Sequence, residues 1–169
     1  MSWLFGILTV LALAAFAAWL VIGAVRRTTA RQAATLPAPA PCPPRDAADG
    51  PGGVPLAGPV QAHYLGTTFA PSTVRRVAAH GLLGRNVVTL SVDRAGLRVE
   101  PPAGDGWCVP PSDLRGARVT SHHAGKEAAP GSVLTVEWVL GGTGLISGFV
   151  LDPADVPTWV AAVQAVVPV

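Results

Sequence analysis

The chain has 169 residues, of which 50% are hydrophobic and only 13% are charged, whereas globular domains carry about 25% charged residues. This length allows one folded domain with some chain left over, because domains take about 100–200 residues, and it excludes a multidomain enzyme. The net charge of +2 is too small to indicate a nucleic-acid-binding protein. Two cysteines are too few for a disulfide framework.

An uninterrupted apolar run opens the chain. No residue between Trp3 and Val25 is charged, and as an α-helix this run would extend about 34 Å, slightly more than the ~30 Å hydrocarbon core of a bilayer. We therefore predict a transmembrane anchor over residues 1–27. A cleaved signal peptide is the alternative, but it needs a basic start and a shorter apolar run, and Met1-Ser2 carries no positive side chain.

The arginines around this run predict its orientation. Arg26, Arg27 and Arg31 follow the apolar run and no arginine precedes it. Since Lys and Arg close to a span mark its cytoplasmic side, we expect the N-terminus outside and the rest of the chain in the cytoplasm.

Residues 28–59 are predicted to form a linker, because they show no periodicity and are rich in proline, which interrupts both helices and strand ladders. The prolines are Pro37, Pro39, Pro41, Pro43, Pro44, Pro51, Pro55 and Pro59. A spacer is the simplest use of such a segment, and a proline-rich partner motif is the alternative.

Residues 60–169 change to short β-like runs. Val87–Val92 alternates apolar and polar residues, and Leu97–Glu100 returns after a turn in which Gly96 tolerates a positive φ. A second hairpin joins Ser132–Leu140 to Leu145–Leu151 through a glycine-rich turn. Less regular runs are Val60–Thr68, Trp107–Val109 and Ala117–Ser121. About seven strands indicate a sandwich or a small barrel.

A helix is predicted to follow the last strand. Asp152 is a favourable N-cap, with Pro153 at the first helical position and Asp155 in the first turn. Apolar residues then recur at helical spacing, and Trp159 is the natural plug for one open end of a barrel.

No motif for catalysis, metal binding or a cofactor is present in the sequence. There is no G-x-S-x-G, C-x-x-C or P-loop pattern, and we predict no catalytic residue, metal or cofactor. The histidines are interpreted as surface or strand-edge residues; they are His63, His80, His122 and His123. Cys108 follows Trp107 in an apolar run and is expected to be a buried reduced thiol, unpaired with Cys42 in the cytoplasm.

One basic cluster is the candidate binding site. Arg75, Arg76, His80 and Arg85 fall between the first two strands of the domain, where a loop could meet anionic lipid headgroups or an acidic partner. Residues 58–169 hold eight basic and eight acidic residues, and anionic lipid recognition usually takes clusters of about 4–8 Lys/Arg. A solvated loop is the alternative interpretation.

Four stretches resemble a known family. They are Tyr64–Thr68, Arg76–Arg85, Ser112–Gly116 and the helix around Asp155–Val160. They are similar to actinobacterial small membrane proteins that have a pleckstrin-homology-like (PH-like) domain, are encoded near pyrimidine-biosynthesis genes and are sometimes labelled transporters. The resemblance implies a seven-stranded, partly open barrel closed by a C-terminal helix, one N-terminal span and no enzymatic activity. A single helix cannot enclose a transport pathway unless many chains assemble.

These observations predict a single-pass protein of the inner (plasma) membrane with a cytoplasmic PH-like domain. The domain would bind or scaffold, with anionic lipid headgroups or a membrane protein as its partner. Two other hypotheses remain: an exported β-domain anchored at, or released from, the outer face of the membrane, and an enzyme whose site brings a histidine to Cys108 or to carboxylates.

Overall fold

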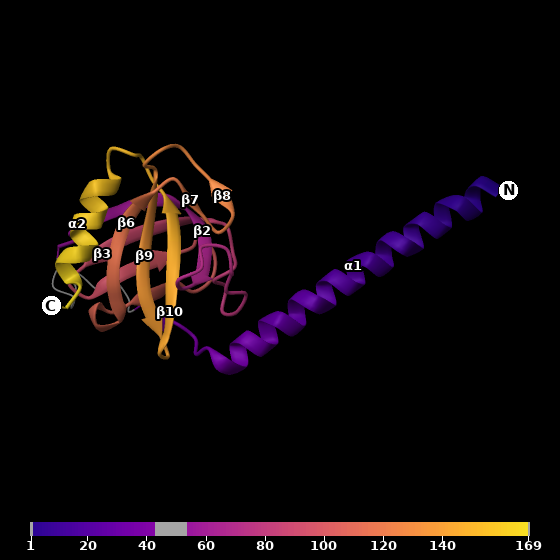
Figure 1. The fold of residues 1–169 in the computed structure, drawn as a ribbon, viewed down its shortest axis with the longest axis horizontal. Coiled ribbons are helices and arrows are strands. Elements are labelled where there is room, and N and C mark those ends of the chain that lie inside the picture. The colour runs from indigo at the N-terminus through magenta and orange to yellow at the C-terminus, as the bar shows by residue number, and fades with distance from the viewer. Residues whose placement is uncertain (1, 43–53, 169) are drawn as a thin grey trace.

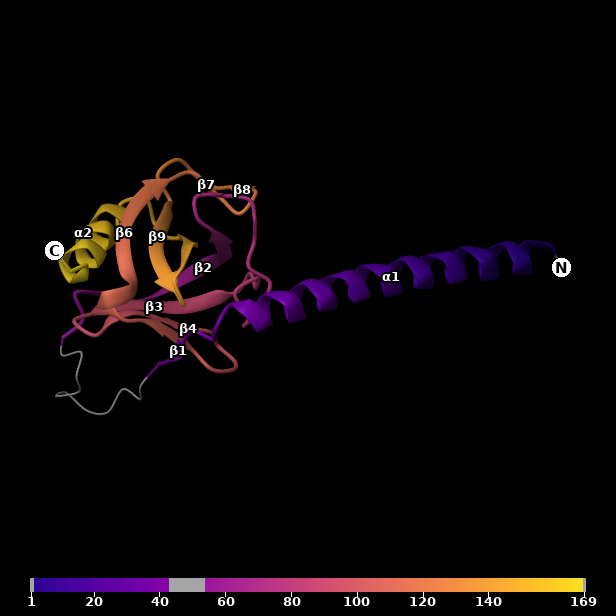
Figure 2. The same ribbon diagram turned by 60° about the horizontal axis from the view of Figure 1, so that its bottom comes forward.

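The computed structural model describes residues 2–42 and 54–168 and consists of one long helix and one β-rich domain. The helix α1 (Ser2–Thr35) projects away from the domain, and the C-terminal helix α2 (Val156–Val166) lies on the opposite side of the domain (Figures 1 and 2). The strands between them form the body of the domain.

Helix α1 extends further than the predicted anchor. It continues to Thr35, because the residues after Val25 include good helix formers and no proline until Pro37. Within Thr9–Thr35, a stretch of 18 residues has a mean hydropathy of 2.0, and none of that stretch is buried. This helix is therefore long and apolar enough to cross a membrane, a property that signal sequences share.

The predicted linker is only partly within the described residues, since residues 43–53 lie outside them. Before that gap, Ala40–Pro41 forms the short strand β1, which pairs with the edge of the sheet. Proline is compatible with this position because an edge strand needs no ladder hydrogen bond on its outer side. The start of the predicted linker therefore belongs to α1, and parts of it on both sides of residues 43–53 contribute to the sheet, since β2 begins at Ala57.

All seven predicted strands are present in one antiparallel sheet. Their order, with β1 at the edge, is β1-β5-β4-β3-β2-β10-β9-β6. The seven are β2 (Ala57–Phe69), β3 (Val87–Asp93), β4 (Gly96–Glu100), β5 (Trp107–Val109), β6 (Leu114–Thr120), β9 (Val133–Leu140) and β10 (Thr143–Val150). A separate pair of two-residue strands, β7 (His122–His123) and β8 (Lys126–Glu127), lies between β6 and β9 in the chain, and a 3₁₀ turn, η1 (Pro111–Asp113), precedes β6.

The two predicted hairpins are confirmed. Asp93 pairs with Gly96 across a two-residue turn, and Gly96 has φ 119°. A Cβ at Gly96 would collide with the carbonyl of Val109 on the neighbouring strand, so this position needs glycine for both its backbone angle and the close approach of β5. The β9–β10 hairpin pairs Leu140 with Thr143.

Helix α2 begins later than predicted. Its first residue is Val156 and its N-cap is Asp155, whereas Asp152 accepts a hydrogen bond from the backbone N–H of Ala154 in the preceding turn (2.9 Å). Pro157 explains the shift, because a proline deep in a helix clashes with the carbonyl four residues earlier. Starting at Val156 places Pro157 in the first turn, where proline is favourable.

Helix α2 closes the core of the domain. It packs mainly on β6, with further contacts to β2, β3, β4 and β9. Trp159 is buried, and its ring lies so close to β2 that a Cβ at Gly58 would approach the Trp159 Cη2 atom to 2.9 Å. The fold is thus an N-terminal apolar helix followed by an antiparallel β-sheet domain packed against a C-terminal helix, as predicted.

Candidate functional site

The predicted basic cluster lies in the segment 70–86, which folds back onto the sheet. Backbone hydrogen bonds join it to β2, including Val77 N–H to the Thr67 carbonyl and Thr67 N–H to the Leu82 carbonyl. Val77 and Leu82 are fully buried. The segment is therefore anchored in the core by a few buried residues, whereas eight of its 17 residues are exposed.

Arg76 has a structural role within this segment. Its Nη2 donates hydrogen bonds to the carbonyl oxygens of Leu83 (2.7 Å) and Leu65 (3.2 Å). Burial, followed by the nearby charge of Arg85, lowers the pKa of the Arg76 guanidinium. Because Nη2 donates to the protein's own backbone, Arg76 ties the segment to β2.

The other members of the predicted cluster have separate surroundings. The His80 Nε2 lies 2.7 Å from the Leu36 carbonyl oxygen, to which it donates. Arg85 donates to the Ala124 carbonyl (3.3 Å). Arg75 is exposed and its guanidinium lies 4.6 Å from the centre of the Phe69 ring. Of the four predicted residues, Arg75 and Arg85 are the exposed cations.

A chain of buried hydroxyl groups, which the sequence did not reveal, holds the same segment from inside. The Tyr64 hydroxyl donates to the Leu82 carbonyl (3.0 Å) and lies 2.5 Å from the Thr67 hydroxyl. The Thr67 hydroxyl lies 2.6 Å from that of Ser147, which accepts from the Trp138 indole N–H (2.9 Å). Each hydroxyl has one hydrogen, and that of Tyr64 is used on the Leu82 carbonyl. Trp138 therefore donates to Ser147, Ser147 donates to Thr67, and Thr67 donates to Tyr64. All donors are used, which suits a structural network.

His123 differs from the sequence prediction. It was expected at the surface or at a strand edge, but it is fully buried, while its neighbour His122 is exposed. The His123 ring occupies the space above Gly148, where a Cβ would collide with it, and its Nε2 lies 3.1 Å from the Gly66 carbonyl oxygen. Glycines inside strands often mark positions that another group approaches closely. Gly66 and Gly148 are therefore the sequence signal that could have indicated a side chain packed on these strands.

Burial makes His123 the basis of a pH prediction. Burial, only partly offset by its hydrogen bond to Gly66, lowers the pKa of His123 below its ordinary value of 6.5. As the pH falls below about 6.5 the unfolded chain takes up a proton that the folded chain does not, so stability should decrease. The free energy of unfolding should fall by about 1.4 kcal/mol for each unit by which the His123 pKa is lower in the folded than in the unfolded chain. Below the folded-state pKa both states are protonated and no further loss is expected. Thermal unfolding of the full chain in detergent between pH 7.5 and 5.5 measures it.

Histidine 122 supplies the matched control for this experiment. His123→Gln keeps a polar side chain but cannot titrate, and it should flatten the pH dependence. His122→Gln removes only the small contribution of His122 to the lowered pKa of His123, so it should retain most of the slope. Equal slopes in both variants would assign the pH dependence to other groups.

The end of helix α1 is docked onto the domain at the segment 70–86. The Gln32 side-chain oxygen accepts a hydrogen bond from Ala78 N–H (2.5 Å), and its amide nitrogen donates to the Arg76 carbonyl (3.5 Å). Leu36 is 2% exposed and belongs to the core of the domain. A Cβ at Gly141 would lie 2.7 Å from Pro37, so the β9–β10 turn also abuts this connection. The helix and the domain are therefore joined by specific contacts.

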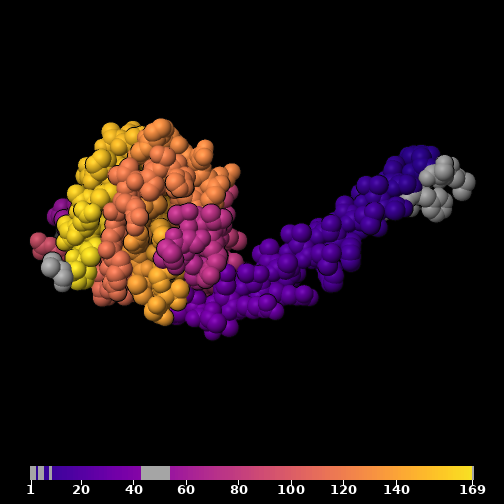
Figure 3. Space-filling view, in the orientation of Figure 1, coloured from indigo at the N-terminus to yellow at the C-terminus, as the bar shows by residue number. Residues whose placement is uncertain are grey.

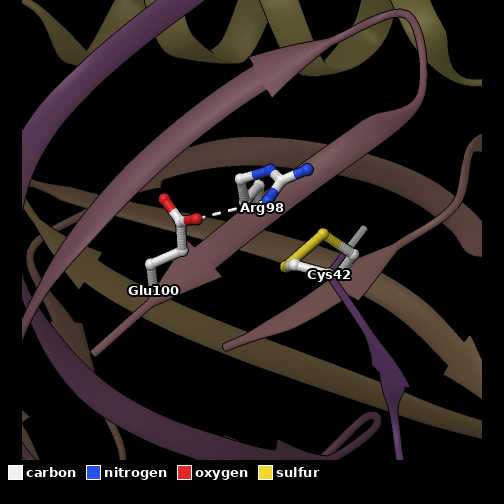
Figure 4. A network of polar contacts seen from close by, with 4 residues as sticks. Cys42, Arg98 and Glu100 are labelled. Atoms are coloured by element: carbon white, nitrogen blue, oxygen red, sulfur yellow. Dashed lines mark hydrogen bonds and ion pairs between the residues drawn. A yellow bond between two sulfur atoms is a disulfide. The ribbon is translucent and has the colours of Figure 1, made fainter. Parts of the chain in front are cut away.

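Cys42 and Cys108 form a disulfide, which contradicts the prediction of a reduced thiol at Cys108. Ala40 pairs with Cys108 in the β1–β5 ladder, so β1 brings Cys42 to β5, and the two Cα atoms are 5.0 Å apart. The Arg98–Glu100 ion pair (3.2 Å) lies beside the disulfide (Figure 4). The sequence argument failed because it derived the state of Cys108 from a cytoplasmic location, whereas strand pairing decides which cysteines meet.

The described residues offer little for catalysis or metal binding. A cavity of about 150 Å³ beside the disulfide is lined by Ala40, Arg98 and Cys108 among others, and it is smaller than the ~300–1,000 Å³ of usual ligand pockets. Within residues 2–42 and 54–168, no three His, Cys, Asp or Glu side chains are grouped so that they could hold a metal ion. Cys108 is also not a free thiol for a nucleophilic site.

Comparison with known proteins identifies the domain. Residues 40–164 match the family model described as Bacterial PH domain-like, and no curated protein matches the chain. The match begins at β1 and ends within α2, so it includes the disulfide, the whole sheet and most of the closing helix. Because it spans well over half of the 169 residues, the chain belongs to the Bacterial PH domain-like family.

Proposed function

We propose that this protein is a single-pass, membrane-anchored PH-like binding module without catalytic activity, held at the extracytoplasmic face of the inner (plasma) membrane. The long apolar part of α1, none of which is buried against the domain, carries this proposal. Gln32 bonds to Ala78 and Leu36 lies in the core, so the end of α1 that follows the apolar run is fixed to the domain. The finer likeness to actinobacterial proteins encoded near pyrimidine-biosynthesis genes remains a prediction.

Two features favour opposite sides of the membrane for the domain. Arg26, Arg27 and Arg31 favour a cytoplasmic domain, whereas the Cys42–Cys108 disulfide favours an oxidising compartment. The arginine bias is a statistical preference during insertion, but a disulfide is a covalent bond that cytoplasmic reductants would break. We therefore place the domain outside, in agreement with the sequence hypothesis of an exported β-domain.

Binding suits the domain better than catalysis does. The buried hydroxyls from Tyr64 to Ser147 donate to one another and to backbone, so no hydroxyl of that network is left to act as a nucleophile. Anchoring also raises the effective concentration of the domain near the bilayer, so that weak contacts with lipid headgroups or a membrane protein would be occupied. A lipid headgroup and a membrane protein are both compatible with a binding module that its anchor holds beside the bilayer.

Paired reporter fusions to Val169 test the proposed side. In a bacterial host, a full-length fusion to alkaline phosphatase should be active, because that enzyme needs an oxidising compartment, and a fusion to green fluorescent protein should be dark. Trapping thiols with a maleimide in intact cells should leave Cys42 and Cys108 unlabelled until a reductant is added. The opposite outcome would place the domain in the cytoplasm: a fluorescent green-fluorescent-protein fusion, an inactive phosphatase fusion, and thiols that are labelled without a reductant.

A further inference from the structure

We infer that the domain rests directly on the bilayer through one basic surface that surrounds the end of α1, and that this surface binds anionic phospholipid headgroups. The surface, called here the helix-side surface, comprises Val74, Arg75, Arg85, Lys126, Arg26, Arg27 and Arg31. The inference depends on the proposed membrane anchoring, but not on the side of the membrane that the domain occupies.

The docking contacts determine which part of the domain faces the membrane. Gln32 lies less than two helical turns beyond Arg27 and holds Ala78 and the Arg76 carbonyl, so the segment 70–86 stays beside the end of α1. In Figures 1 and 2, β7 and β8 also lie on the side of the domain toward the free part of α1, whereas α2 lies on the far side. Figure 3 shows the segment around residues 70–85, in magenta, standing out between the strands and α1.

The tip of the segment 70–86 presents an apolar side chain beside a cation. Val74 is 68% exposed, and the Ser72 hydroxyl accepts hydrogen bonds from the backbone N–H groups of Val74 (3.2 Å) and Arg75 (3.0 Å). The Phe69 N–H donates to the Arg75 carbonyl, which closes the tip. An exposed apolar residue on a fixed turn next to an arginine suits the boundary between headgroups and acyl chains, where the cation can reach phosphates.

The β7–β8 hairpin belongs to the same surface. Arg85 donates to the Ala124 carbonyl, and Ala124 N–H donates to the Thr73 carbonyl. These two bonds hold the hairpin against the tip, and Lys126, two residues after Ala124, is exposed. The surface is therefore assembled from segments that are about 40 residues apart in the chain.

The charges on this surface are nearly all positive. Arg26, Arg27, Arg31, Arg75, Arg85 and Lys126 contribute six cations, and Glu127 is the one acidic residue within the segments 26–36, 70–86 and 122–127. No acidic residue occurs between Val54 and Val92. Six cations fall within the range of about 4–8 that recognises anionic lipids. The domain alone has equal numbers of positive and negative residues, so the folding of the chain concentrates this charge next to the membrane.

A position-specific fluorescent probe in lipid nanodiscs tests the inference. The full oxidised chain with Val74→Cys is labelled with an environment-sensitive dye and reconstituted in discs of phosphatidylcholine alone or with 30% phosphatidylglycerol. Thr158→Cys, exposed on α2 at the far side of the domain, is the matched control. A quencher carried on the lipid should quench the Val74 probe at least threefold more than the Thr158 probe in the anionic discs. Equal quenching at the two positions would overturn the inference.

Charge reversal separates headgroup binding from mere proximity. Arg75→Glu should reduce the quenching of the Val74 probe in anionic discs to its level in phosphatidylcholine discs, whereas Arg94→Glu, an equal charge change in the β3–β4 turn, should leave it unchanged. The same loss in both variants would show that net charge, and not this surface, governs the contact. Failure of the chain to enter discs would instead contradict the proposed anchoring. The reporter fusions test independently on which side of the membrane the domain lies.

Discussion

Replacing Cys108 with serine should lower the free energy of unfolding of the oxidised full-length protein by about 4 kcal/mol. The disulfide joins residues 66 positions apart, and a crosslink that closes a loop of this size restricts the unfolded chain strongly. It also holds the two-residue strand β1 on β5, a pairing that is too short to persist on its own hydrogen bonds. Denaturant unfolding of the protein in detergent, followed by near-ultraviolet circular dichroism, measures the change.

The disulfide prediction has two internal controls. Cys42→Ser should cause the same loss, and the double variant should be no less stable than either single variant, because each change removes the same bond. A reductant should destabilise the parent protein to the level of the variants and leave the variants unchanged. If the reductant has no effect on the parent protein, the bond is absent in solution and the extracytoplasmic proposal loses its main support.

Replacing Trp159 with alanine should lower the free energy of unfolding by about 3–5 kcal/mol, the usual cost of truncating a buried tryptophan. Trp159 is 4% exposed and fills the space between α2 and β2 at Gly58. The surrounding strands are hydrogen-bonded into one sheet and cannot collapse into the cavity that alanine would leave. The same denaturant unfolding experiment measures this effect.

Thr158 provides the control for the Trp159 prediction. It precedes Trp159 on α2 but is exposed, so Thr158→Ala should change stability by no more than about 0.5 kcal/mol. A similar effect of both substitutions would mean that α2 contributes through its helical structure alone and that Trp159 does not close the core.

Local patterns predicted most of the fold. The β3–β4 and β9–β10 hairpins were recognisable because alternation and turn residues act over a few positions, and Gly96 was singled out correctly as a residue with positive φ. The start of α2 was misplaced because Asp152-Pro153 and Asp155-Val156-Pro157 are both acceptable helix starts. Only a helix that begins at Val156 places Pro157 in its first turn.

The candidate site was less predictable, because its contacts join distant parts of the chain. The clustering of arginines and His80 in the segment 70–86 was visible, but the structure directs Arg76 to backbone carbonyls and His80 to the end of α1. Gln32, which docks the helix, carries no sequence signal that distinguishes it from any exposed glutamine. The burial of His123 depends on two glycines in β2 and β10, strands that it does not belong to.

The sequence by itself determined the apolar helix, the seven strands, the closing helix and the low charge of the domain, since each follows from residues that are near neighbours. The tertiary structure decided three things: that Cys42 meets Cys108, that α1 is docked to the domain by Gln32 and Leu36, and that its arginines join those of the domain on one surface. The physical reason is that strand order and register determine which residues meet across large separations in the chain. A net charge of +2 is too small to predict any binding surface, but six cations placed around the end of one helix predict a bilayer contact.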